Sequence, residues 1–291
     1  MSAVQFAYLG LPGSMVQLPI PRRGFEAPPS MGDAVHTLLS GGSAKVKQLY
    51  PKRSFTLPYD VSTAEADTIL GFYQGLYGTG PYRFVDPTAR NMLPLDASAL
   101  GLRPQADDGW NAAVGSLATA STGGPAGVLS GVLTWTGFAA GNTLAPGPTA
   151  ARPAAAPVYL PGEPCTVSLY AKAASATTHT LRLLGCDATG TQTVVSSTTS
   201  MALTTSFQRF SVSIAAGNGS YAAVVFVLPQ ILVGATAPTS ITVAAAQVEY
   251  ADAVSAFQPG FGCPRVVISS APGRAISAPG YRAHTLTLAE V

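Results

Sequence analysis

Charged side chains are scarce in this sequence. Among 291 residues there are 16 Lys and Arg and 14 Asp and Glu, so 10% of the chain is charged and the net charge is +2. Soluble domains average about 25% charged residues. A nucleic-acid-binding protein needs a clustered basic face, which this balance does not favour. The few carboxylates and three histidines leave little material for acid–base catalysis. Composition therefore favours a structural or binding protein over an enzyme, with no nucleic-acid partner.

Motifs for catalysis and cofactor binding are also lacking. The sequence contains no GxSxG, GxxxxGKS/T or HExxH pattern. Gly217-Asn218-Gly219 precedes an apolar run typical of a strand, so it predicts a turn and not a dinucleotide-binding loop. His36, His179 and His284 lie far apart in the sequence and in different predicted elements. We therefore expect no catalytic residue and no cofactor.

A metal site has one candidate in the sequence. Asp107 and Asp108 lie at a predicted domain boundary and could ligate Ca²⁺, with Asp187 or Asp252 as helpers. Calcium takes about six to eight oxygen ligands, and few carboxylates are available nearby. A solvated linker explains the pair better, and we expect no bound metal.

Cysteines are few and long hydrophobic runs are missing. Cys165, Cys186 and Cys263 form no CxxC pair, so we expect buried thiols. A disulfide between Cys165 and Cys186 would require their strands to form a hairpin, and manufacture in a reducing cytoplasm disfavours it. The most apolar stretch, residues 222–235, is shorter than the roughly 20 residues of a membrane-spanning helix. We expect no membrane insertion and identify no signal peptide at residues 1–10.

Short alternating runs dominate the middle of the chain. Residues 109–262 hold four basic and four acidic side chains and are rich in Ala, Val, Thr, Ser and Gly. Many short strands separated by turn residues predict an antiparallel sandwich or jelly roll. The expected strands are 128–136, 166–172, 180–186, 192–198, 207–214, 221–228 and 240–249.

The flanks of the chain predict a second β domain with one helix. Ser62 and Glu65 fit a capping box, and Gly78 can end the helix. Two tail strands, 265–269 and 284–288, are marginal alone and need a host sheet. The apolar face of the helix is expected at Ala66, Ile69, Leu70, Tyr73, Leu76 and Tyr77.

These patterns together define a fold class and domain boundaries. We expect a mainly β chain with a split N- and C-terminal β-barrel-like domain, residues 1–104 with 263–291. An antiparallel β-sandwich (jelly roll), residues 105–262, is inserted between the two parts. The boundaries follow the fall in charge after residue 108 and the Pro and Gly residues near 259–264.

Aromatic residues are the remaining functional signal. Trp135 lies in an apolar run and is expected in the core. Trp110, Tyr159 and Tyr170 are the candidate glycan-contacting residues. Tyr170 alternates with Leu169, so its side chain is expected to point away from the sandwich core.

Several stretches resemble a carbohydrate-binding-module-like jelly roll that recurs in phage tail proteins. Its last strand typically ends in Gln-x-Glu and is followed by Ala and a Pro-Gly pair, as at Gln247, Glu249, Ala256, Pro259 and Gly260. The flanks are similar to minor tail proteins of long-tailed actinobacterial phages and to the N-terminal barrel of distal tail proteins. The sandwich stretches are TVSLYAKA (166–173), HTLRLLGCDATGTQTV (179–194), TTSFQRFSVSI (204–214) and QVEYADAVSAFQPG (247–260). The flanking ones are RSFTLPY (53–59), GTGPYRFVDP (78–87) and RAHTLTLAEV (282–291).

The resemblance implies a structural virion protein of the tail tip or baseplate, synthesised in the host cytoplasm. Its expected partners are further copies of itself, in a threefold or sixfold ring, and other tail proteins. The sandwich would face outward for host attachment. The alternative is a glycan-binding adhesion module as the primary function, with host cell-wall glycan as the partner. The resemblance supplies no catalytic residue and no sugar-binding residue.

Overall fold

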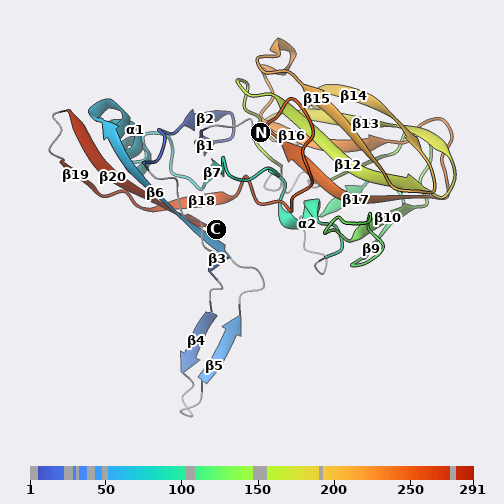
Figure 1. Ribbon diagram of the computed structural model, residues 1–291, viewed down its shortest axis with the longest axis horizontal. Helices are drawn as coiled ribbons and strands as arrows, with labels where there is room; N and C mark the ends of the chain where they lie inside the picture. The colour runs from blue at the N-terminus through green and yellow to red at the C-terminus, as the bar shows by residue number, and fades with distance from the viewer. Residues whose placement is uncertain are drawn as a thin grey trace. The chain divides into compact units, whose positions relative to one another are not determined.

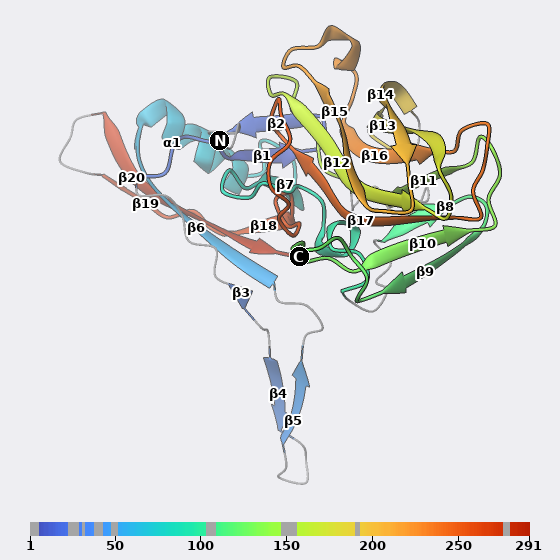
Figure 2. The same ribbon diagram turned by 45° about the vertical axis from the view of Figure 1, so that its right-hand side comes forward.

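The chain folds into two units built mainly of strands (Figures 1 and 2). The computed structural model describes residues 6–22, 29–30, 33–37, 43–47, 52–102, 109–146, 156–189, 193–275 and 280–291. Within these residues, no helix is long and apolar enough to cross a membrane. The split-sheet unit comprises Phe6–Leu11, Val16–Phe84 and Pro264–Val291, and the sandwich unit comprises Pro12–Met15 and Val85–Cys263.

The split-sheet unit contains an eight-stranded sheet in the order β2-β1-β7-β18-β20-β6-β3, with β19 paired to β20. This order is an open path across the described strands, so the expected barrel-like closure is wrong although the mainly β class is confirmed. β4 and β5 form a separate two-stranded sheet. The strands are β1 (Tyr8–Leu11), β2 (Ser14–Gln17), β3 (Pro29–Ser30), β4 (Asp33–Thr37), β5 (Ser43–Lys47), β6 (Lys52–Ser62), β7 (Tyr82–Val85), β18 (Arg265–Ser270), β19 (Gly273–Ala275) and β20 (Tyr281–Glu290).

The two ends of the chain meet in this sheet. β20 pairs antiparallel with β6, from Tyr281 opposite Ser62 to Ala289 opposite Ser54. Alternate residues of both strands are buried, because one face of the sheet packs against helix α1 (Thr63–Tyr73). This core contains Phe55, Leu57, Tyr59, Ile69, Phe72, Leu286 and Leu288.

Helix α1 begins where the sequence predicts and ends earlier. The Ser62 hydroxyl accepts a hydrogen bond from the Glu65 backbone N–H, and the Glu65 carboxylate accepts one from the Ser62 N–H at 2.9 Å. The helix stops at Tyr73 and not near Gly78, because Gly75 takes the left-handed φ of +79°. The expected apolar face is therefore wrong at its C-terminal end. Tyr73, Leu76 and Tyr77 are exposed, and the buried hydrophobic residues are Ala66, Ile69 and Phe72.

The sandwich unit holds two antiparallel five-stranded sheets, as the sequence predicts. One has the order β15-β12-β17-β10-β9, the other β14-β13-β16-β11-β8. The first contains β9 (Ser116–Ala120), β10 (Val132–Thr136), β12 (Cys165–Ala173), β15 (Gln208–Ile214) and β17 (Ser240–Glu249). The second contains β8 (Trp110–Ala112), β11 (Thr143–Pro146), β13 (Thr177–Cys186), β14 (Thr193–Leu203) and β16 (Phe226–Leu232).

Cys165 and Cys186 lie on β12 and β13, which belong to different sheets and form no hairpin. Both cysteines are buried free thiols. Burial raises the pKa of each thiol, that of Cys186 to about 11. They are therefore protonated, unreactive core residues near neutral pH.

Residues 85–102 belong to the sandwich unit, whereas the sequence placed them in the split domain. Helix α2 (Leu95–Ser98) packs against β17. The Ser98 hydroxyl accepts a hydrogen bond from the Gly260 N–H at 2.7 Å. A Cβ at Gly260 would lie 1.9 Å from the Leu93 carbonyl oxygen, so only glycine fits this approach. The boundary moves because α2 is buried by a strand more than 140 residues later in the chain.

Asn91 joins this segment to β17. Its side chain is buried and its amide nitrogen donates to the carbonyl oxygens of Ala246 and Gln258, both at 2.9 Å. Its amide oxygen accepts from the N–H groups of Leu93 and Val248, both at 3.1 Å. All four hydrogen-bonding positions of one buried amide are therefore satisfied.

Candidate functional site

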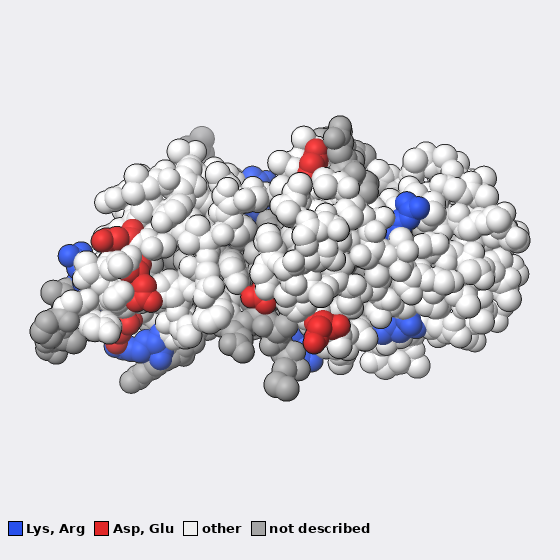
Figure 3. Space-filling model, turned by 90° about the horizontal axis from the view of Figure 1, so that it is seen from above, with Lys and Arg blue, Asp and Glu red and all other residues white. Residues whose placement is uncertain are grey.

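Most of the surface visible in Figure 3 is neither acidic nor basic, in keeping with a chain that is 10% charged. Among the described residues, no three His, Cys, Asp or Glu side chains gather in a group that could hold a metal ion. The calcium candidates Asp107 and Asp108 lie outside the described residues. Because charged side chains are few, those that lie beside aromatic rings are the best guide to a candidate binding site.

The three candidate aromatic residues occupy different environments. Trp110 is 5% exposed and its indole N–H donates to the Ala97 carbonyl at 2.9 Å. Tyr159 is 2% exposed, and burial raises its pKa. Tyr170 is partly exposed and lies on the outer face of its sheet, alternating with buried Leu169 as predicted. Of the three, Tyr170 alone has ring surface that a ligand can meet without rearrangement. Trp135 is fully buried in the core, as predicted.

Tyr170 belongs to a small aromatic cluster, which we call the ring patch (Tyr170, Phe207 and Phe257, with Lys172 and Arg209). The three rings are partly buried and pack against a floor of three buried apolar residues. They come from β12, the residue before β15, and the segment after β17. The floor consists of Val132, Ala244 and Ala245.

Two cations lie against these rings. The Lys172 ammonium is 4.7 Å from the centre of the Phe207 ring, and the Arg209 guanidinium is 5.5 Å from that of Tyr170. These distances are within the range of cation–π attraction. The patch thus offers apolar ring surface with positive charge beside it.

A β-bulge lies beneath the ring patch. The register between β12 and β17 shifts between Ser168 and Tyr170, and Ala245 takes a φ of +49°. A left-handed conformation at a residue with a Cβ costs about 1 kcal/mol. The Ala245 N–H donates to the Ser130 hydroxyl at 3.0 Å, which helps to hold the bulge. Bulges recur next to binding sites because they re-aim neighbouring side chains.

The Gln-x-Glu motif of β17 holds the following segment, residues 251–260, which we call the strap. The Glu249 carboxylate accepts from the Ser255 N–H at 3.0 Å, and the Gln247 side-chain oxygen accepts from the Gln258 N–H at 3.1 Å. Arg209 donates to the Ser255 carbonyl. The motif is therefore structural, and it places Phe257 of the strap in the ring patch.

The outer face of the opposite sheet has a different chemistry. Arg182 on β13 donates weakly to Gln230 on β16 at 3.5 Å, among Thr and Ser side chains. The aromatic residues in the described strands of this sheet, Trp110 and Phe226, are both buried. Within the described strands, this face supplies polar groups and one cation but no ring for a ligand to stack on.

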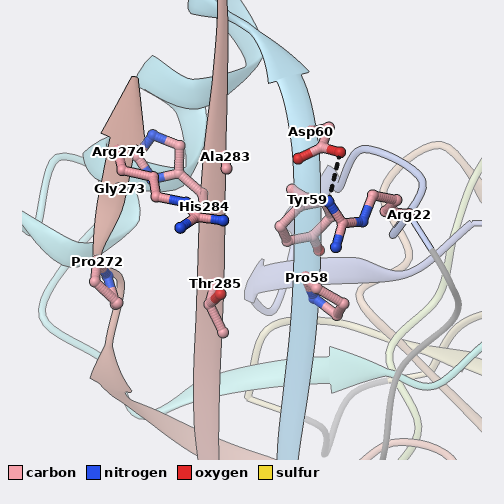
Figure 4. Close-up of a pocket in the computed structure, with 10 residues that line it drawn as sticks. All are labelled: Arg22, Pro58, Tyr59, Asp60, Pro272, Gly273, Arg274, Ala283, His284 and Thr285. Carbon is pink, nitrogen blue, oxygen red and sulfur yellow. Dashed lines mark hydrogen bonds and ion pairs between the residues drawn. The ribbon is translucent and has the colours of Figure 1, made fainter. Parts of the chain in front are cut away.

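A cavity of about 230 Å³ opens on the split-sheet unit (Figure 4). Arg22 is paired with Asp60 at 2.9 Å on one side, and Arg274 extends from β19 across β20 on the other. Tyr59 and His284 also line it, but they are opposite each other in the buried row of β6 and β20 that faces the core. The polar wall of the cavity is thus three exposed charged side chains, and we assign it no function.

Sequence reasoning missed most of the ring patch. Phe207 was expected as the first residue of a strand and lies one residue before β15, whereas Phe257 lies in the strap, eight residues after β17. Nothing in the local pattern of either residue indicates that it meets Tyr170. The row Ser168, Tyr170 and Lys172 on β12 did carry one, because a ring and a cation two residues apart point to the same face.

Comparisons with known proteins give a likeness of fold only. No protein-family model matches the sequence, and no curated protein matches it. The structure of an arabinose-bound α-L-arabinofuranosidase covers 55% of this chain and 26% of the enzyme's chain, at 13% sequence identity and a TM-score of 0.41. Tailspike protein 4 of bacteriophage CBA120 covers 55% of this chain and 22% of the tailspike chain, at 10% identity and a TM-score of 0.40. A xylan-binding domain from Paenibacillus barcinonensis covers 57% of this chain and 100% of its own length, at 15% identity and a TM-score of 0.35. The chain therefore spans about a quarter of the first two proteins, and at these TM-scores function has to be argued from its own residues.

Proposed function

We propose that this protein is a non-catalytic component of a phage tail tip whose β-sandwich binds a glycan of the host surface. The observation that supports glycan binding is the ring patch, three partly exposed rings on an apolar floor with cations beside them. Sugars present C–H faces that stack on aromatic rings and hydroxyls that bind polar groups. Binding sites for small ligands combine these two features. The phage assignment rests on the resemblance of the sequence to tail proteins.

The test of glycan binding is a panel of host-wall polysaccharides with Tyr170→Ala and a matched Tyr281→Ala control. Tyr281 is 51% exposed on β20 of the split-sheet unit, so its loss removes an exposed ring elsewhere. We expect Tyr170→Ala to weaken binding about tenfold, because a ring contact contributes roughly 1 kcal/mol beyond its buried area. Tyr281→Ala should bind like the parent. Failure of the parent to bind any polysaccharide of the panel would contradict the proposal.

Assembly into a tail structure is the second part of the proposal. Tyr73, Leu76 and Tyr77 leave an exposed apolar cluster at the end of α1, with Leu76 76% exposed. Exposed apolar clusters of this kind mark protein interfaces. A closed ring, threefold or sixfold, would bury it through head-to-tail contacts.

Light scattering of the purified chain tests the assembly. We expect a defined oligomer, and Leu76→Asp should shift it toward the monomer because a buried carboxylate opposes the contact. Ala64→Asp, at an exposed position in the first turn of the same helix, is the control. A parent that remains monomeric and joins no other tail protein would remove this part of the proposal.

A further inference from the structure

We infer that the ligand of the ring patch is an acidic glycan, a polysaccharide whose sugars carry carboxylate or phosphate groups. The inference rests on the proposed glycan-binding function and adds the charge of the ligand. It starts from the distribution of charge. Residues 109–262 contain four basic side chains, and two of them, Lys172 and Arg209, lie in the ring patch.

Of the two cations, Lys172 is the one that no carboxylate offsets on this sheet face. Within the described residues, neither Lys172 nor Arg209 forms an ion pair, and both lie against rings. Arg209 and Glu249 are bound to the same residue, Ser255, so Glu249 offsets part of the charge of Arg209. The carboxylate on the same sheet face is Glu249, which pairs with Thr166. That position is six residues along β12 from Lys172, or roughly 20 Å at about 3.3 Å per residue. At physiological ionic strength charges are screened beyond about 8 Å, so Glu249 does not cancel the charge of Lys172.

The two cations are suited to different parts of binding. Arg209 is fixed, because its guanidinium donates to the Ser255 carbonyl and, at 3.0 Å, to the Ser168 hydroxyl. It holds the strap beside Tyr170, and Glu249, which binds the same Ser255, offsets part of its charge. The Lys172 ammonium has no hydrogen-bond partner among the described residues and lies against the Phe207 ring.

Energy favours transfer of Lys172 from the ring to an anion. A cation–π contact at a partly exposed site is weaker than a hydrogen bond between two charged groups. An oxyanion on a sugar stacked at the ring patch would therefore draw the Lys172 ammonium away from Phe207. A neutral hydroxyl accepts a weaker hydrogen bond and brings no opposite charge, so it competes less well with the ring.

The experiment compares polymers that differ only in charge. Polygalacturonate is paired with its methyl ester, and phosphomannan with the dephosphorylated mannan, so that the arms distinguish carboxylate from phosphate. Affinities are measured by calorimetry on the full chain at low and high salt. We expect one or both acidic polymers to bind about tenfold more tightly than the uncharged partner, with the difference shrinking as salt is added.

Three variants locate the effect. Lys172→Met should reduce affinity for the acidic polymer about tenfold, and Lys172→Arg should retain it. Arg182→Met removes the same charge from the outer face of the opposite sheet and should change affinity by less than about twofold. Tryptophan fluorescence checks that each variant is folded, since both tryptophans lie in the sandwich unit.

Two kinds of failure are distinguishable. Equal binding of charged and uncharged polymers, or a loss with Arg182→Met as large as with Lys172→Met, would overturn the acidic ligand and leave glycan binding intact. An absence of binding to all four polymers and to the host-wall panel would overturn the proposed function itself.

Discussion

Among the side chains that the structure describes, each unit buries one histidine, and the two have opposite surroundings. In the sandwich unit, His179 is 1% exposed, its Nδ1 accepts from the Gly234 N–H at 3.0 Å and its Nε2 lies 2.8 Å from the Thr177 hydroxyl. In the split-sheet unit, His284 is 3% exposed and neither ring nitrogen has a hydrogen-bond partner among the described residues.

The surroundings of His284 explain how such a residue is tolerated. Its ring lies over Gly273, its partner on β19, where a Cβ would be 2.1 Å from the imidazole. Burial lowers the pKa of both histidines, so both are neutral near pH 7. His179 therefore links neighbouring segments through hydrogen bonds, whereas His284 only fills space with its ring. The residues around each side chain decide which of the two roles it has.

The largest expected effect in the sandwich unit is at Asn91, a buried amide whose four hydrogen-bonding positions are all occupied. Asn91→Ala leaves two carbonyl groups and two N–H groups without partners in a buried site. We expect it to lower the free energy of unfolding of the sandwich by about 3–5 kcal/mol. Urea unfolding followed by tryptophan fluorescence reports this unit. Asn111→Ala, at an exposed position of β8, is the control and should cost less than about 0.5 kcal/mol. An equally small loss of unfolding free energy in Asn91→Ala would contradict a stabilising role for the Asn91 hydrogen bonds.

The histidines themselves give the sharpest contrast. His179→Phe should destabilise the sandwich by about 1–3 kcal/mol, because it leaves the Gly234 N–H unpartnered. His284→Phe should be neutral or stabilising, because it removes two buried polar atoms that have no partner and keeps a ring over Gly273. Urea unfolding at pH 7.5 compares the two variants. Equal losses of unfolding free energy in the two variants would contradict the difference between the two histidines.

The pH dependence follows from the lowered pKa values. The folded state favours the neutral imidazole, so its contribution is fully present above the unfolded pKa of about 6.5. It declines as the pH falls below that value toward the folded pKa. Each His→Phe variant should therefore lose less stability than the parent between pH 7 and pH 5. An unchanged pH slope in both variants would contradict the assignment.

The smallest expected effects are at the ion pairs of the split-sheet unit. Arg53 and Glu290 pair at 3.2 Å with side chains 14% and 20% exposed, whereas Arg22 and Asp60 pair at 2.9 Å with 49% and 32%. Glu290→Gln should cost up to about 1 kcal/mol and Asp60→Asn about 0.5 kcal/mol or less. Thermal unfolding followed by circular dichroism at low and high salt compares them. The reverse order would mean that exposure does not govern these pairs.

Strands with strong alternation could be predicted from the sequence. The expected strand 166–172 is observed as Cys165–Ala173, and 240–249 as Ser240–Glu249. The strand expected at 221–228 is observed at Phe226–Leu232, so it extends past Pro229. In the structure Pro229 lies within the strand, where β11 pairs only with Ile231 and Leu232. A proline is tolerated where no second ladder needs its donor.

The candidate site was only partly predictable for a related reason. Tyr170 was found because alternation tells which face of a strand a residue occupies. Trp110 and Tyr159 look equally available in the sequence but are buried by residues distant in the chain. Asn91 gave no signal at all, because its four partners lie two to 167 residues away.

The sequence by itself determined the elements that depend on local chemistry. Period-two alternation specified the sandwich strands, and Ser62 with Glu65 specified where α1 begins. The tertiary structure alone decided the open path of the split sheet, the place of α2 beneath β17, and the meeting of three rings and two cations on one sheet face. The reason is physical: alternation and capping act over a few residues, whereas burial and hydrogen-bond partners depend on segments that only the fold brings together.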